Sequence, residues 1–399
     1  YTVTFTGLFG NADVSQMTSA VTSGTGTIAH ATTTAGGGNT IVNSANNDTA
    51  ANASLLLSGG ITVTNELLRL DSINNNGNNG QGFLLQGALR SLDGNNVWQG
   101  SVVLNADSTA NFADVRVKVD QDRLTINGGI TQTGVTAVGM GLFKLGDGTL
   151  QLAGSTPNSV GTPGTGNSAV IRAAQGTIEL NKTPGVDAVR GRVEAGDNNG
   201  GAGVDRIVWL ASDQYGDQLN VANALLLAET TGLMDLNGFN ETVVGPGTNS
   251  MYTRLGTLWS GTFELNGGTL TLGNGTNAVG HWGTGTSGAR LSISPPGLIR
   301  DTAGTGLVVL RTNNAAWDSV DSIAVVDTQV SARISNSGGG RILKTAAGWL
   351  GLTADNSGTY TGAATVISAG AFTVAAGNAL GNAASTISVT GAAALAGLP

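Results

Sequence analysis

His30 and His281 are the only imidazole side chains in the 399-residue chain. Neither of them has a nucleophile elbow or a second ligand at metal-binding spacing beside it. The chain has no cysteine, which excludes thiolate metal sites, cysteine nucleophiles and disulfide bonds. We therefore expect both histidines to lie in loops or on the surface without a catalytic role.

Paired carboxylates are the other candidates for catalysis. Glycosidases use two carboxylates on one face of the protein, and enzymes that act on polysaccharides often build such sites on β-helices. Asp213 with Asp217, and Asp318 with Asp321 near Arg311, are the nearest such groups. Carboxylate pairs are common in loops, so we expect a protein that is not an enzyme and needs no cofactor.

A calcium motif is present once. Residues 200–205, Gly-Gly-Ala-Gly-Val-Asp, fit the Gly-Gly-x-Gly-x-Asp turn in which stacked turns share Ca²⁺ between carboxylates. The neighbouring nonapeptides do not repeat the motif, and one half-site cannot enclose the ion. We therefore expect a glycine loop without metal, and Asp197 and Asp205 as the ligands if calcium binds.

Charge and hydropathy limit the partners. The net charge is −8, from 18 basic and 26 acidic residues, and no run of Lys or Arg is present to neutralise phosphates, so nucleic acid is not expected. No stretch approaches the roughly 18 apolar residues of a membrane helix, so membrane insertion is not expected either. The chain starts at Tyr1 rather than Met, as an exported mature chain would. We expect a secreted protein at the cell surface.

Composition and short apolar runs predict strands. A hydrophobic fraction of 40% with only 11% charged residues indicates a folded chain, although 63 residues are glycine. Apolar or alternating runs closed by Gly, Asn or Asp are typical of strands and turns. Examples are Ser54–Leu57, Ile61–Thr64, Val115–Val119, Arg206–Leu210 and Gln329–Ile334. The segment Val221–Glu229 fits either two helical turns or a strand.

A repeat orders these strands. The unit Gly-x-apolar-x-apolar begins at positions 148, 176, 232, 261, 268 and 348. Its first intervals are about 28 residues or twice that length, which is a solenoid period with insertions. Stacked rungs pair their backbones along the axis and send alternate side chains into apolar columns. The sequence therefore predicts an all-β, right-handed parallel β-helix, or β-solenoid, with an irregular N-terminal segment.

The clearest copy of the repeat lies near the C-terminus. Residues 343–352, Leu-Lys-Thr-Ala-Ala-Gly-Trp-Leu-Gly-Leu, are followed by Gly-Thr-Tyr-Thr-Gly at 358–362, Thr-Val-Ile at 365–367 and Gly-Ala-Phe-Thr-Val at 370–374. This pattern resembles the autotransporter-associated β-strand repeat, and residues 143–152 form a weaker copy. Ala346 and Ala363 stand where the family has glycine. The resemblance implies a β-solenoid outside a bacterial cell and no particular activity.

Three regions follow from these patterns. Residues 1–50 form an N-terminal strand and a capping segment, residues 51–335 a degenerate solenoid, and residues 336–399 the clearest repeat. Tyr1, Val3 and Phe5 alternate with threonines as in an amphipathic strand. Because a solenoid has two open ends, we expect head-to-tail assembly in which this strand completes a neighbouring subunit. The alternative is a strand that folds back on its own coil.

These observations predict an extracellular structural protein, a subunit of a self-assembling surface filament or matrix, whose partner is itself. The alternative is an adhesin or autotransporter passenger that binds host or matrix glycans. A polysaccharide-acting enzyme is a third possibility.

Overall fold

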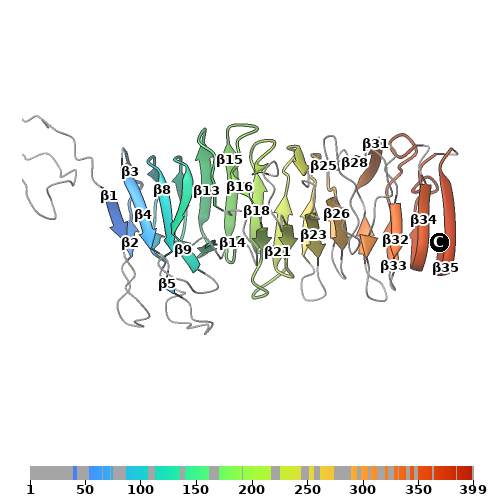
Figure 1. Cartoon of the computed structure of the whole chain (residues 1–399), viewed down its shortest axis with the longest axis horizontal. Helices are drawn as coiled ribbons and strands as arrows, with labels where there is room; N and C mark the ends of the chain where they lie inside the picture. Colours follow the sequence, from blue (N-terminus) through green and yellow to red (C-terminus); the bar gives the residue numbers. More distant parts are fainter. Residues whose placement is uncertain are drawn as a thin grey trace, which may run out of the picture.

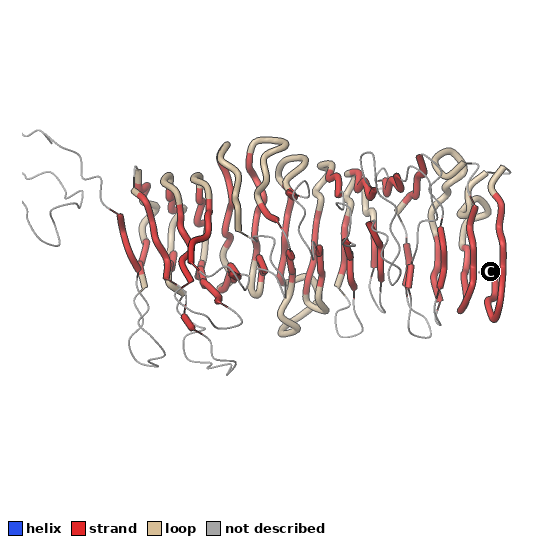
Figure 2. Tube along the Cα trace, in the orientation of Figure 1, coloured by secondary structure: helices blue, strands red, loops and turns tan. Residues whose placement is uncertain are grey.

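The computed structural model describes most of the repeat region and part of each end. The described residues are 39–42, 54–64, 66–71, 73–74, 87–106, 113–134, 140–160, 170–190, 192–216, 225–243, 251–255, 261–273, 289–293, 298–303, 307–311, 320–321, 328–330, 332–337, 342–345, 349–361, 364–382 and 384–397. Their secondary structure consists of 35 strands, β1 to β35, and no helix. The strands lie across the long axis of a rod, from β1 at one end to β35 at the other (Figures 1 and 2).

Each rung contributes up to three strands, one to each of three faces. The first face contains β2 (Leu55–Leu57), β6 (Leu89–Ser91), β9 (Ala113–Val119), β12 (Met140–Leu145), β14 (Val170–Ala173), β17 (Arg192–Ala195), β20 (Leu225–Ala228), β23 (Met251–Leu255), β26 (Ala289–Ile293), β29 (Val320–Asp321) and β32 (Ile342–Thr345). The second face contains β3 (Thr62–Val63), β7 (Asn96–Trp98), β10 (Arg123–Ile126), β13 (Thr149–Gly154), β15 (Thr177–Lys182), β18 (Asp205–Trp209), β21 (Gly232–Asp235), β24 (Thr262–Glu264), β27 (Leu298–Arg300), β30 (Thr328–Val330) and β33 (Trp349–Leu352).

The third face contains β1 (Asn39–Val42), β4 (Leu67–Asp71), β8 (Val102–Ala106), β11 (Ile130–Gly134), β16 (Val189–Arg190), β19 (Tyr215–Gly216), β22 (Glu241–Val243), β25 (Thr269–Gly273), β28 (Leu307–Arg311) and β31 (Arg333–Ser337). The last two strands, β34 (Ala364–Val374) and β35 (Thr386–Gly397), each run over the first and second faces. A short strand, β5 (Ile73–Asn74), lies outside this scheme and pairs antiparallel with β9. Every other strand pair in the described residues is parallel, so the fold is the predicted parallel β-solenoid. The right-handedness of the solenoid stays a prediction.

The register sets the length of the rungs. Thr149 pairs with Thr177, which pairs with Arg206, so these successive rungs each take about 28 residues. This confirms the period predicted from the glycine units. The interval from Gly176 to Gly232 is twice as long because it covers two rungs, and the intervening strand β18 lacks the Gly-x-apolar-x-apolar unit.

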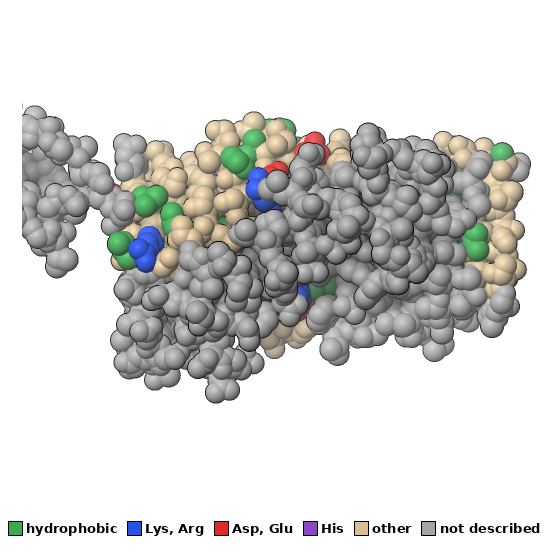
Figure 3. All heavy atoms as spheres, viewed as in Figure 1, with side chains coloured by type: hydrophobic (Ala, Val, Ile, Leu, Met, Phe, Trp, Pro, Cys, Tyr) green, Lys and Arg blue, Asp and Glu red, His purple; other side chains and the backbone are tan. Residues whose placement is uncertain are grey.

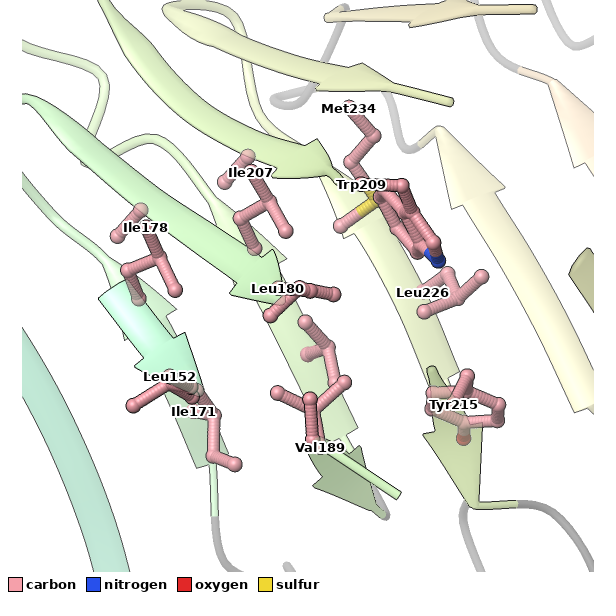
Figure 4. Close-up of a cluster of buried hydrophobic side chains, with 14 of the residues drawn as sticks. Leu152, Ile171, Ile178, Leu180, Val189, Ile207, Trp209, Tyr215, Leu226 and Met234 are labelled. Atoms are coloured by element: carbon pink, nitrogen blue, oxygen red, sulfur yellow. The ribbon is translucent and has the colours of Figure 1, made fainter. Parts of the chain in front are cut away.

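Inward side chains stack in columns along the axis. One column on the second face contains Leu124, Leu150, Ile178, Ile207, Met234 and Phe263, and each of these side chains is fully buried. A parallel column contains Ile126, Leu152, Leu180 and Trp209, part of which is shown in Figure 4. Each apolar side chain is thus covered by its equivalents in the rungs before and after it, which removes it from water.

Two local predictions can be compared with the strands of the structure. The end of Val221–Glu229 is a strand, β20, which removes the helical alternative. The predicted strand Gln329–Ile334 is wrong in its extent, because it divides between β30 on the second face and β31 on the third. A corner of the solenoid lies between these two strands, and an apolar run that continues around a corner is not distinguished by alternation from a single strand.

Candidate functional site

The buried charged side chains of the described residues lie in the middle of the rod, between positions 144 and 264. They gather where the chain turns between faces. We call the turn from the first to the second face the first corner, and the turn from the second to the third face the second corner. These two corners bring together groups that are far apart in sequence.

An acid and arginine cluster occupies the first corner over three rungs. The Arg172 guanidinium lies 2.8 Å from the Glu229 carboxylate and 3.7 Å from the Glu194 carboxylate, and Arg192 forms an ion pair with Glu194. Asn198 donates its side-chain N–H to Glu229 at 2.8 Å. Both glutamates are buried, with side-chain exposures of 3% and 4%. Substrate therefore has little access to this carboxylate pair.

Burial changes the acidity of the cluster. It raises the pKa of Glu229 to about 7, and the nearby Arg172 offsets part of that rise. A buried carboxylate with a raised pKa beside a second buried carboxylate resembles the acid of a catalytic pair. Here, however, both carboxylates bind the same arginine, and they span the wide turn after β17 that begins at Gly196. The geometry fits a structural clamp.

The two residues named for calcium, Asp197 and Asp205, lie in the same corner. The Asp205 carboxylate accepts a 2.6 Å hydrogen bond from the hydroxyl of Thr231, and burial raises the pKa of Asp205 to about 6. Asp197 accepts a hydrogen bond from the backbone of Asn199. Over the described part of the chain, no group of three or more His, Cys, Asp or Glu side chains is placed to hold a metal ion.

Lys144 closes the first corner one rung earlier. Its ammonium group is buried and donates to the carbonyl oxygens of Gly146, Gly148 and Gln175. Burial lowers the pKa of Lys144 to about 7, although Asp147 and Asp205 favour the charged form. One side chain thus supplies donors to carbonyl oxygens of two stacked turns, which keeps these backbone groups satisfied inside the protein.

At the second corner, buried side chains make the hydrogen bonds to neighbouring rungs that a strand backbone makes elsewhere. Asn158 accepts a hydrogen bond from the backbone N–H of Ile130 in the rung before and donates to the carbonyl of Ala188 in the rung after. Near the C-terminus, Asn356 binds Ile334 and Ala379 in the same way. A buried asparagine with one donor and one acceptor therefore replaces a ladder pair at the corner.

Glu241 is a variant of this arrangement. Its carboxylate accepts hydrogen bonds from the indole of Trp209 at 2.7 Å and from the backbone N–H groups of Gln214 and Tyr215. Burial raises the pKa of Glu241 to about 8, and those donors oppose the rise. The group is inaccessible to solvent and serves the rung register.

A shallow open groove runs along the second corner. Its lining includes Asn181, Thr183, Leu210, Ser212 and the half-buried ring of Phe239. One aromatic ring beside amide and hydroxyl groups suits the edge of a neutral sugar. The Ser212 hydroxyl, however, already accepts a hydrogen bond from the backbone of Asn240.

The C-terminal end of the rod has a different character. β35 pairs with β34, and in the described residues no strand lies against its other edge. Ile387 stacks on Thr365 and Val389 stacks on Ile367. Thr365 and Ile367 are fully buried. Ile387 and Val389 are nevertheless 44% and 45% exposed. They occupy core positions that no further rung covers within the described structure.

The remaining predicted residues are not brought together. Tyr1, Val3, Phe5, both histidines, Asp217 and Asp318 lie outside the described residues. Asp213 is exposed in a second-corner turn, Arg311 ends β28 on the third face, and Asp321 ends β29 on the first face. Sequence reasoning missed Lys144 and Glu229, because one charged residue in an apolar repeat gives no sign that it points inward.

Comparison with known proteins adds no assignment. No protein-family model, no curated protein and no solved structure matches the chain. The structure describes no helix that is long and apolar enough to cross a membrane.

Proposed function

We propose that this protein is an extracellular structural subunit that assembles end to end into a filament or matrix. The observation that carries the proposal is the pair Ile387 and Val389, which continue buried core columns and yet are almost half exposed. A parallel stack leaves unpaired backbone groups and apolar side chains at its end, and such an end binds another strand. Hydrophobic side chains are visible at the β35 end in Figure 3.

The distribution of exposed apolar side chains supports the proposal. Large exposed hydrophobic residues of the described structure lie at Ile41, Leu56, Ile61, Val204, Ile387 and Val389. The first three belong to β1, β2 and the turn before β3, and the last two belong to β35. Among these six, only Val204 lies in the body of the rod. Ile41 and Leu56 point out of the sides of the rod, because their neighbours Val42 and Leu57 are the buried residues, whereas Ile387 and Val389 lie in core columns.

The buried charges also support a structural role over catalysis. Glu194, Glu229 and Arg172 bind one another, and Lys144 binds carbonyl oxygens of its own turns. The raised pKa of Glu229 and the lowered pKa of Lys144 result from burial. The resemblance of residues 343–374 to the autotransporter-associated repeat supports an extracellular location.

The test is electron microscopy of the intact chain and of the double variant Ile387→Lys/Val389→Lys. Because both side chains are partly exposed, the variant is expected to fold, and two charges at the end are expected to abolish filaments. Val204→Lys is the control for each substitution, since it places one lysine on an exposed apolar residue of the body. Filaments of undiminished length in the double variant would contradict the proposal.

Single rods from the unmodified chain would also overturn it. Binding of those rods to a glycan array would then favour the adhesin, and loss of that binding in Phe239→Ala would locate the site in the second-corner groove. Release of reducing ends from polysaccharide would favour the enzyme.

A further inference from the structure

The groove along the second corner crosses several rungs in the body of the rod. It follows the ends of β13, β15, β18 and β21, which are neighbours on the second face, from Gly154 over residues 181–184 and 210–212 to Phe239. Neighbouring strands lie about 4.8 Å apart, so the groove extends for about 14 Å, which is longer than a single sugar ring. Its volume is about 440 Å³, within the roughly 300–1,000 Å³ of small-molecule sites.

Hydrogen bonds between successive turns hold the walls of this groove. The backbone N–H of Gly185 donates to the carbonyl of Ser212 at 3.3 Å. The backbone N–H of Asp213 donates to the carbonyl of Asn240 at 2.9 Å, and the N–H of Asn240 donates to the hydroxyl of Ser212 at 3.1 Å. The groove is therefore formed in advance, and a ligand does not have to order its walls.

Polar side chains of the lining are available to a ligand. Asn181 is half-buried and Thr183 is exposed. Within the described structure, neither the Asn181 amide nor the Thr183 hydroxyl has a hydrogen-bond partner. The amide offers donors and an acceptor side by side, and the Ser212 hydroxyl still has its own O–H to donate. These groups suit a ligand that is rich in hydroxyls.

The rest of the lining is apolar or neutralised. Phe239 and Leu210 are half-buried, and each leaves part of its side chain on the groove. Lys182 is the one charged residue among the described residues of the lining. It is 1% exposed, and its ammonium group donates to the carbonyls of Gly128 and Ala153. The lining therefore presents an aromatic ring and no accessible charge.

We infer that this groove binds a neutral saccharide, with a sugar ring against Phe239 and its hydroxyl groups on Asn181 and Thr183. A sugar ring has C–H groups that pack on the electron-rich face of an aromatic ring, and hydroxyls at its rim that pair with amides. The exposed carboxylate of Asp213, in the same turn as Ser212, disfavours acidic sugars by repulsion. The inference goes beyond the proposed assembly and does not depend on it, since the groove includes neither end of the rod.

Saturation-transfer NMR of the full chain with neutral tetrasaccharides of glucose, mannose and galactose tests the inference. Tetragalacturonate, which has the same length and a carboxylate on every ring, is the control ligand. We expect saturation transfer to at least one neutral tetrasaccharide and several-fold less transfer to tetragalacturonate. The absence of transfer to every neutral tetrasaccharide, or equal transfer to tetragalacturonate, would overturn the inference.

Substitutions locate the bound sugar. Phe239→Leu keeps an apolar side chain against the core and removes the ring, and Asn181→Ala removes the free amide, so each is expected to weaken binding several-fold. Phe239→Tyr keeps the ring and is expected to keep binding. Phe143→Ala is the matched control, because it removes an aromatic ring from the first face. Affinities of Phe239→Leu and Asn181→Ala as high as that of Phe143→Ala would place the sugar elsewhere and refute the inference.

Electron microscopy of the same variants separates this inference from the proposed function. Circular dichroism first shows that each variant is folded, and Asn181→Ala, at a half-buried polar position, keeps the test decisive if Phe239→Leu unfolds. Both groove variants are expected to form filaments like the intact chain. Filaments of an intact chain that binds no neutral tetrasaccharide would refute the saccharide site and leave end-to-end assembly standing. Single rods that bind a neutral tetrasaccharide through Asn181 would confirm the site and refute the assembly.

Discussion

The rungs in the middle of the rod and those at its C-terminal end differ in length and in how the chain passes from the first face to the second. In the middle, Thr149, Thr177 and Arg206 stack at intervals of about 28 residues, a common solenoid period. Near the end the interval from Leu350 to Phe372 is shorter by about a fifth. The middle rungs turn between separate strands of the first and second faces. β34 and β35 instead run over both faces, and a register shift between Ile367 and Ala369 replaces the turn.

The additional residues of the middle rungs have a consequence for hydrogen bonding. Wider turns leave backbone carbonyl and N–H groups without ladder partners, and these groups must be satisfied inside the protein. The buried charged residues of the described structure all lie in the long rungs, where Lys144 and Glu241 each bind several backbone groups. Asn158 in the long rungs and Asn356 near the C-terminus make the same pair of hydrogen bonds at the second corner. The long rungs therefore add charged side chains to a corner asparagine that both regions have.

The largest expected contrast lies in the core columns. Leu180→Ala should lower the free energy of unfolding by about 2–5 kcal/mol, because a fully buried side chain between neighbouring rungs leaves a cavity. Ile387→Ala should lower it by less than about 1 kcal/mol, since that side chain is almost half exposed. Urea unfolding of both variants measures the difference, and equal losses would show that the end of the rod is covered.

The next contrast is between a glycine in close contact with the backbone of the neighbouring rung and a glycine in open space. A Cβ at Gly232 would overlap the carbonyl oxygen of Ala195 in the rung before, whereas one at Gly377 would meet no atom within 4 Å. Gly232→Ala should cost about 1–3 kcal/mol, as overpacking does. Gly377→Ala should be neutral or stabilise by up to about 1 kcal/mol. Thermal unfolding monitored by circular dichroism compares the two, and a tolerated Gly232→Ala would indicate that the rungs separate easily.

The corner asparagines test what the two regions share. Asn158→Ala and Asn356→Ala each remove hydrogen bonds to the rung before and to the rung after. Each should cost about 1–2 kcal/mol, because a backbone N–H and a carbonyl are left buried without partners. The exposed Asn199 provides the control, and Asn199→Ala should have a smaller effect. A loss confined to Asn158 would show that only the long rungs need this bond.

The last expected difference is the pH dependence of the free energy of unfolding, which depends on the buried charges of the long rungs in the middle of the rod. The pKa of Glu229 is raised from 4.5 in the unfolded chain to about 7 in the fold, so its protonated form stabilises the fold. That stability is complete below pH 4.5 and is lost as the pH rises through 7.

Asp205, with a pKa raised to about 6, acts in the same direction. The pKa of Lys144 is lowered, so the neutral form of Lys144 stabilises the fold above pH 10.5. That stability is lost as the pH falls from 10.5 through 7, a range that lies above the one in which Glu229 titrates. Unfolding measured from pH 4 to 7 should therefore show decreasing stability for the intact chain and a flatter profile for Glu229→Gln. An unchanged profile in that variant would show that Glu229 does not titrate in this range.

Parts of the fold were predictable from local patterns. Alternation in Gly148–Leu152 and in Gly176–Leu180 predicted strands and their inward residues, because neighbouring side chains of a strand point to opposite faces. The regular interval between these two units predicted stacking. Where the chain rounds a corner, as in Gln329–Ile334, alternation continues through the turn, and the boundary was not predictable.

The candidate site was less accessible to sequence reasoning. Asp197 and Asp205 were singled out from a calcium motif, and both lie in the first corner, but Thr231 and the backbone of Asn199 bind them. Glu194 and Arg172 were not singled out. They lie far apart along the chain and meet only because β14 and β17 are adjacent rungs.

Residue order alone dictates that the chain forms a glycine-rich stack of strands with apolar columns, because strand periodicity and rung length are local properties. Tertiary packing decides which polar residues point inward and which of them meet at the corners. These properties depend on what lies in the rung before and the rung after, and no single segment contains that information.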